Sequence, residues 1–183
     1  VYIEGGESFQ QGQELAIYRQ IRRIVHPVTG ESYGWSTELI GSVRVVDTSP
    51  DVAIGRIMQA FRPVERGDFV APLPESFGSR VRPVAATSEA RGYILETAGD
   101  ILGPVGEHNM VYIDRGRRHG VQAGNTFDVF HRGDRFSSRT AGLPNERVGR
   151  LMVIDVGEEA STAVVIMSVF EVRVGDKIEM TPE

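Results

Sequence analysis

Histidine is the residue type in this chain best suited to chemistry, because the sequence contains no cysteine. The four histidines are His26, His108, His119 and His131. Imidazole serves as a general base or as a zinc ligand only when a second group stands at a suitable spacing. None of the four is spaced as a metal pair on a helix or strand. We therefore expect histidines in exposed turns, and the alternative is a zinc site made by His108, His119 and a carboxylate.

Other catalytic patterns are weak. No serine lies in a G-x-S-x-G elbow, and Glu158 and Glu159 fall in an expected turn, where they are more simply solvated charges than an acid/base pair. Asp47 and Asp155 recur at matched places, which favours a structural role at a strand end over an active site present in both halves. We predict a non-enzymatic chain with no catalytic residue, no metal site and no cofactor.

A loop surface is the better candidate for function, since binding residues often lie on loops held by a rigid scaffold. The stretch His-Pro-Val-Thr-Gly-Glu at 26–31 predicts the tip of a hairpin, and residues 20–25 and 32–40 are its arms. The candidate contact residues on this hairpin are Arg22, Arg23, His26, Tyr33 and Trp35. The alternative is that Tyr33 and Trp35 fold back over an open barrel end.

The sequence segments on either side of this loop each have a similar counterpart later in the chain. Residues 1–6 read VYIEGG and residues 111–116 read VYIDRG. Further matches, in the same order, are 12–18 with 124–130, 41–47 with 149–155, 56–61 with 165–170, and 64–70 with 172–178. Blocks in one order predict an internal duplication. Between residues 48 and 62 the alignment could shift by one position, which in a strand would exchange the two faces.

The repeated blocks have the composition of short strands separated by turns. They predict an all-β fold of two tandem small antiparallel barrels, SH3-like or related. The modules span 1–71 and 92–183, with a linker at 72–91. The second begins with a strand near Gly92 that the first lacks, so we expect the first to be truncated at its N-terminus. The RGD at 66–68 matches VGD at 174–176 and predicts a turn, and a second RGD at 132–134 falls in a loop.

Charge and hydropathy narrow the classes of partner. The formal net charge of −5 argues against general nucleic-acid binding, which needs a basic face. Apolar runs are too short to span a bilayer, so we expect no membrane insertion by this segment. We find no signal-peptide pattern, and a chain without cysteine is compatible with both the periplasm and the cytoplasm.

The second half reads VYIDRGRRHGVQAGNTFDVF, then GRLMVIDVGEEASTAVVI, then VRVGDKIE. This succession of strand and turn motifs resembles the small β-barrel modules at the C-terminus of flagellar assembly protein T. The whole chain resembles the region downstream of the LysM domain in bacterial LysM-containing envelope proteins. The resemblance implies a periplasmic or cell-envelope location and a role as a scaffold or interaction module, with an envelope protein or peptidoglycan as partner.

The glycan link in this reading comes from an upstream LysM domain that is not present in this sequence, so no sugar-binding residue is assigned here. Two alternatives stay open. One is an accessory domain of a cell-wall glycan hydrolase, which needs convergent carboxylates. The other is a ring-forming flagellar or envelope assembly module, which needs an oligomer.

Overall fold

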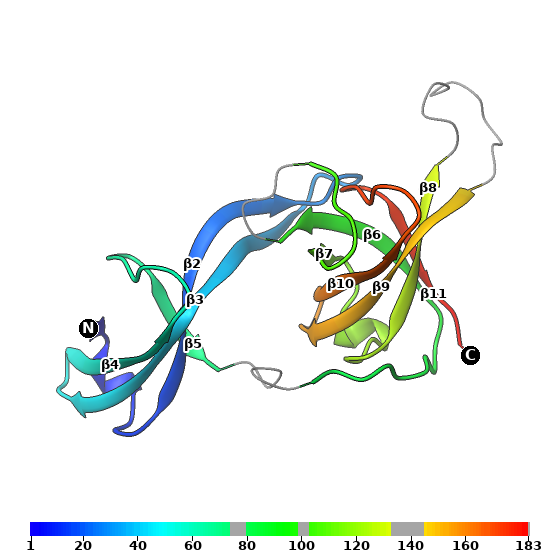
Figure 1. Ribbon diagram of the computed structural model, residues 1–183. Helices are drawn as coiled ribbons and strands as arrows, with labels where there is room; N and C mark the ends of the chain where they lie inside the picture. Colours follow the sequence, from blue (N-terminus) through cyan, green and yellow to red (C-terminus); the bar gives the residue numbers. More distant parts are fainter. Residues whose placement is uncertain (74–79, 99–102, 133–144, 183) are drawn as a thin grey trace. The chain divides into compact units, whose positions relative to one another are not determined.

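The computed structural model describes residues 1–73, 80–98, 103–132 and 145–182. The chain divides into two compact units (Figure 1). Unit 1 comprises Val1–Arg22 and Thr37–Phe77, and unit 2 comprises Arg23–Ser36 and Gly78–Glu183. The hairpin end that the sequence places in the first module therefore belongs to unit 2.

Unit 1 is an open antiparallel sheet with the strand order β1-β4-β3-β2-β5. Its elements are β1 (Tyr2–Glu4), the short 3₁₀ helix η1 (Gly6–Ser8), β2 (Glu14–Val25), β3 (Ser32–Thr48), β4 (Val52–Ala60) and β5 (Phe69–Pro72), with the hairpin end of β2 and β3 lying in unit 2. The small core consists of Ile3, Leu15, Ile17, Ile40, Val43, Val45 and Ala53. The prediction of a barrel was wrong for this module, because its two outermost strands, β1 and β5, do not pair with each other.

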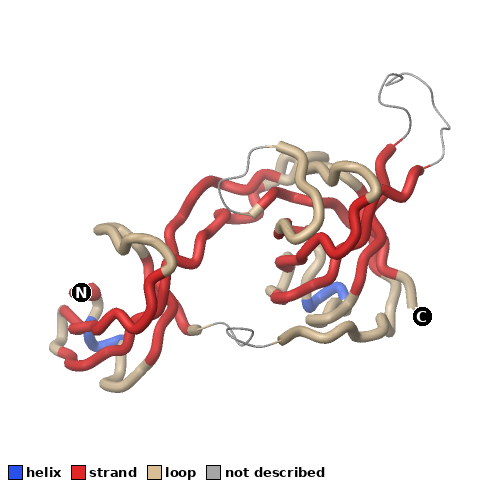
Figure 2. Tube along the Cα trace, in the orientation of Figure 1, coloured by secondary structure: helices blue, strands red, loops and turns tan. Residues whose placement is uncertain are grey.

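Unit 2 contains a closed antiparallel barrel with the order β10-β7-β6-β11-β8-β9. Its elements are β6 (Ala90–Thr97), β7 (Met110–Ile113), η2 (Arg117–His119), β8 (Thr126–Arg132), β9 (Asn145–Val156), β10 (Ser161–Ser168) and β11 (Lys177–Met180). Strands dominate both units (Figure 2), which confirms the all-β prediction. Among the described residues, no helix has the length and apolarity needed to cross a membrane.

The two units share one strand register. Val43 pairs with Ile57, and 108 positions later Leu151 pairs with Val165. Every residue pair between β3 and β4 has such a counterpart between β9 and β10, including the two places where a bulge shifts the register. The predicted alignment of 56–61 with 165–170 is therefore one position out. Both strands keep the same difference of 108 positions, so residues 56–61 correspond to residues 164–169. The common register supports the duplication, which itself stays a prediction.

The matched turns before the last strand of each unit confirm the turn prediction for RGD at 66–68. Gly67 and Gly175 have φ angles of 96° and 89°, which glycine adopts without strain. Asp68 accepts a hydrogen bond from the backbone N–H of Glu65 at 2.8 Å. Asp176 takes the same place in unit 2, again with a donor three residues earlier. Of the second RGD, positions 133 and 134 lie outside the described residues.

Candidate functional site

The hairpin joining β2 to β3 forms as the sequence predicts, with its tip at residues 26–31. The backbone N–H of His26 donates to the carbonyl of Glu31 at 2.8 Å, and Gly30 donates back to His26 at 2.9 Å. These bonds close the tight tip that Pro27 and Gly30 favour. The hairpin end, Arg23–Ser36, packs as part of unit 2.

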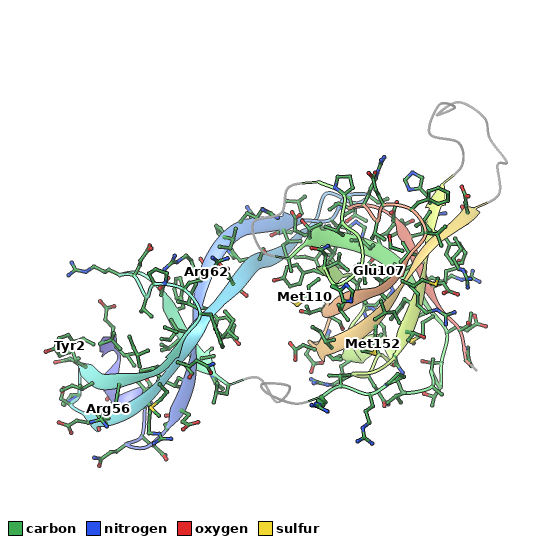
Figure 3. All side chains as sticks on the ribbon, in the orientation of Figure 1. Tyr2, Arg56, Arg62, Glu107, Met110 and Met152 are labelled. Atoms are coloured by element: carbon green, nitrogen blue, oxygen red, sulfur yellow. The ribbon has the colours of Figure 1, made fainter. Side chains whose placement is uncertain are left out.

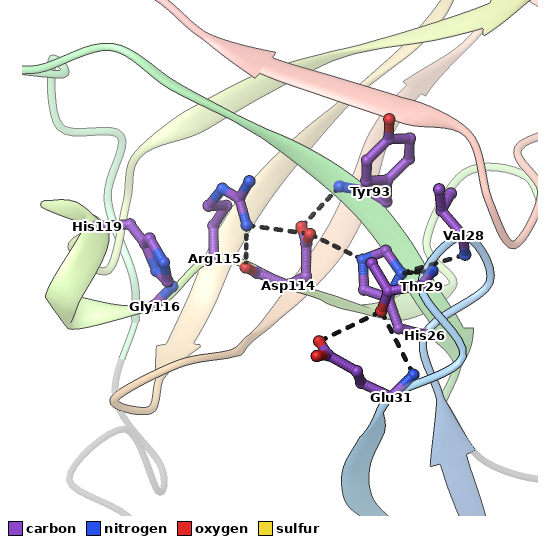
Figure 4. A network of polar contacts seen from close by, with 9 residues as sticks. All are labelled: His26, Val28, Thr29, Glu31, Tyr93, Asp114, Arg115, Gly116 and His119. Atoms are coloured by element: carbon purple, nitrogen blue, oxygen red, sulfur yellow. Dashed lines mark hydrogen bonds and ion pairs between the residues drawn. The ribbon is translucent and has the colours of Figure 1, made fainter.

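His26 is an anchor of this tip and not an exposed turn histidine. Only 5% of the residue is exposed, and its Nε2 lies 3.2 Å from Oδ2 of Asp114 (Figure 4). Its Nδ1 accepts hydrogen bonds from the backbone N–H groups of Val28 and Thr29, both at 3.1 Å. Because Nδ1 is an acceptor twice over, the proton resides on Nε2, which donates to Asp114. The expectation of exposure was wrong because it rested on local turn composition alone.

Asp114 follows β7 and is 2% exposed. Its Oδ1 accepts from the backbone N–H of Tyr93 at 2.6 Å, and its Oδ2 lies 3.0 Å from Nη1 of Arg115. A buried carboxylate is stable only when donors replace its lost hydration, and these groups together with His26 do so. Gly92 makes the space, since a Cβ at that position would stand 2.1 Å from Oδ1.

Two tyrosines enclose the His26 ring. The centroid of Tyr33 lies 5.6 Å away, and Tyr93 meets the ring edge-on at 5.5 Å. Burial raises the pKa of the Tyr33 hydroxyl above its ordinary value, and the negative charge of Asp114 raises it further. The anchor is thus a charged and aromatic cluster formed by the hairpin tip and the strands of the barrel.

The other candidate residues are not part of this cluster. Trp35 is 53% exposed, one residue after Gly34, whose φ of 100° interrupts the regular alternation of β3. Nε of Arg23 donates to Oγ of Ser32 across the hairpin at 2.9 Å. Arg22 belongs to unit 1. The structure therefore brings His26 and Tyr33 together and leaves Trp35 on the surface.

A second pair joins Nδ1 of His131 to Oδ1 of Asp176 at 2.7 Å. Burial raises the pKa of Asp176, and the backbone N–H of Arg173 and His131 counteract that rise. The carboxylate thus has its structural task in the turn before β11. The described residues include no cluster of three potential metal ligands, and in this part of the chain His119 uses its Nδ1 to accept from Gly116.

The arrangement around His26 can hold a loop but cannot easily move a proton. Both ring nitrogens are engaged, so proton transfer at either one would break a bond that fixes the tip. Sequence reasoning missed Asp114, Tyr93 and Arg115. A signal existed in Gly92, because a glycine inside a strand marks the close approach of another group.

No family model and no curated protein matches the chain.

Proposed function

We propose that this chain is a non-catalytic scaffold or interaction module of a bacterial cell-envelope protein, and that the hairpin surface around Trp35 is where it contacts its partner. The observation that carries the proposal is a half-exposed tryptophan on a hairpin whose tip is fixed by a buried His26–Asp114 pair.

Such a side chain is suited to recognition. Tryptophan buries a large apolar area on contact, and it is among the residues that dominate binding energy at interfaces. Binding costs less free energy when the contact residue is already held in place, since little backbone entropy is then lost. Tyr33 lies two positions before Trp35 on the same strand and packs against the ring of His26, which Asp114 anchors, so this cluster supplies that order.

A non-catalytic role is supported by the use of the buried acids. Asp114 holds the hairpin tip through its contact with His26, and Asp176 and Asp68 each hold a turn by accepting a backbone N–H. Protonating a carboxylate that accepts such hydrogen bonds would weaken them and destabilise the turn or tip that it holds. An enzymatic accessory domain would need acids that are free to exchange protons with a substrate.

The envelope location and the partner class rest on the resemblance to LysM-containing envelope proteins. Under this proposal the protein works in the periplasm, an upstream LysM domain contacts peptidoglycan, and the present segment contacts an envelope protein or the glycan itself. A strongly basic surface is not needed for either partner, in keeping with the net charge of −5.

Co-sedimentation tests the proposal. The purified chain is incubated with isolated cell envelopes, and separately with peptidoglycan sacculi stripped of protein, which separates the two partner classes. We expect binding to at least one, weakened about tenfold or more by Trp35→Ala, as for the loss of a central interface tryptophan. Val28→Ala is the matched control, since Val28 is 60% exposed on the same hairpin. Binding of Trp35→Ala as strong as that of the wild type would contradict the proposal. Glycan turnover that a single acid substitution abolishes would contradict it as well.

A further inference from the structure

The open sheet of unit 1 and the barrel of unit 2 differ by one strand. By register, β1, β4, β3, β2 and β5 correspond to β7, β10, β9, β8 and β11. Removing β6 from the closed order of unit 2 leaves the order of unit 1. In unit 2, β6 pairs with β7 on one side and β11 on the other. The counterparts of these two strands in unit 1, β1 and β5, are the two edges of the sheet, so a strand equivalent to β6 would pair with both.

The edge of β1 has backbone groups directed toward this place. Val1 exchanges both of its backbone hydrogen bonds with Gly55, at 2.8 and 2.9 Å. In an antiparallel pair such bonds alternate, so the N–H groups of Tyr2 and Glu4 point away from β4. The counterpart of Glu4 in unit 2 is Asp114, whose N–H donates to the carbonyl of Tyr93 in β6 at 3.2 Å.

The side chains give the same indication. Ile57 lies opposite Val43, which is fully buried in the core, yet Ile57 is 40% exposed. Its counterpart Val165 is 0% exposed. Val64 and Val70 are also only partly buried, whereas their counterparts in the barrel are fully buried. Figure 3 shows the side chains of both units, with Tyr2 labelled on β1, where it is 83% exposed.

Unit 2 shows what covers these positions. The backbone of Val165 bonds to His108 and Asn109, both at 2.9 Å, and Val105 pairs with Val172. These residues, together with Ile94 of β6, come from the segment that precedes β7 in the chain. By register, the equivalent segment of unit 1 would precede Val1 and run along β4 toward Ile57.

We propose that one further strand completes unit 1 into a six-stranded barrel, and that polypeptide joined ahead of Val1 supplies it in cis. The strand lies antiparallel to β1 and β5, and its inward residues are small or aliphatic, like Ala90, Gly92 and Ile94 of β6. A cis source is favoured because closing a short connection costs little entropy, whereas a separate peptide must also pay the entropy of association.

A graft tests this proposal in the full chain. A copy of Ala90–Thr97 is joined to Val1 through a flexible linker as long as the segment from Ala98 to Met110. We expect the amides of Tyr2, Glu4 and Gly67 to exchange with solvent at least about tenfold more slowly, as edge amides do when they become paired. Gly67 is a reporter because its counterpart Gly175 donates to Ile94 of β6 at 2.8 Å.

Three comparisons decide the outcome. The same graft carrying Ile94→Asp should give no protection, because it directs a charge into the core. Unchanged exchange in the original graft would overturn the proposal. Equal protection by the free Ala90–Thr97 peptide at micromolar concentration would overturn the cis source. A chain extended by the residues that its gene encodes ahead of Val1 should show the same protection as the graft, and exchange as fast as in Val1–Glu183 would contradict it.

Discussion

Replacing Asp114 with asparagine should destabilise unit 2 although the side chain keeps its shape. An asparagine can direct its oxygen to the Tyr93 N–H or to the His26 Nε2–H, but not to both. His26 cannot respond by moving its proton, because Nδ1 already accepts from two backbone donors. In either orientation, the amide NH₂ of the asparagine faces one of these two buried donors, which then has no acceptor. The substitution also removes the negative charge that pairs with Arg115.

The size of the effect follows from these lost contacts. A buried donor left without an acceptor costs about 1–3 kcal/mol, so we expect Asp114→Asn to lower the free energy of unfolding of unit 2 by about 2 kcal/mol. Urea unfolding followed by fluorescence measures it, because Trp35 is the only tryptophan and belongs to unit 2.

Glu179→Gln is the matched control for this change. Glu179 pairs with Arg91 at 3.6 Å, and Arg91 has a side chain 75% exposed, so the substitution should cost less than about 0.5 kcal/mol. In the double variant His26→Ala, Asp114→Asn, the loss should be smaller than the sum of the two single losses, since both disrupt one contact. An Asp114→Asn protein as stable as the wild type would refute the anchoring role of the pair.

Four further outcomes are expected. The bond to Arg19 lowers the pKa of Asp68, so the stability that Asp68 contributes is present above its ordinary pKa and is lost as the pH falls through its folded-state pKa. The pKa of Asp176 is raised, so the effect has the opposite sign and the stability of unit 2 falls as the pH rises through that pKa. Asp176→Asn should remove this fall when urea unfolding is measured at a series of pH values. In an ultraviolet absorbance titration, Tyr33→Phe should remove a tyrosine ionisation that lies above the ordinary tyrosine pKa, and a titration curve unchanged at its upper end would contradict the burial of that hydroxyl. Gly67→Ala and Gly175→Ala should each cost about 1 kcal/mol in thermal unfolding, because both φ angles are positive and neither Cβ would meet a close neighbour.

Much of the fold could be predicted because it is encoded locally. Short runs of β-branched residues and turn residues at regular spacing predict strands, and the hairpin tip was found from Pro27 and Gly30. The turn at 66–68 was found by its match to 174–176. Each of these features depends on neighbours only a few positions away.

Barrel closure and the anchor could not be predicted in the same way. His26 and Asp114 are separated by 88 positions in the chain, and no local period relates them. Likewise, the difference between an open sheet and a closed barrel depends on one strand, β6, that pairs with β7 and β11. The sequence did indicate an extra strand near Gly92, but the positions that the whole segment before β7 covers became apparent only when the exposed Ile57 was compared with the buried Val165.

The candidate site shows the same division. Sequence reasoning placed Trp35 and Tyr33 on one hairpin arm, and both do lie there. It could not separate their roles, because that separation depends on Gly34, which interrupts the strand, and on the buried ring of His26.

The proposed contact surface is tested most directly by the fluorescence of Trp35, the one tryptophan in the chain, after the signal of the same additions to the Trp35→Phe variant is subtracted. Sonicated sacculi and detergent-solubilised envelope proteins are added in separate titrations, and acrylamide quenching is measured at each step. Trp35 should become shielded from acrylamide and its emission should shift to shorter wavelength as one of the two is added. Quenching and emission that stay unchanged while the protein co-sediments with envelopes would show that the partner binds elsewhere.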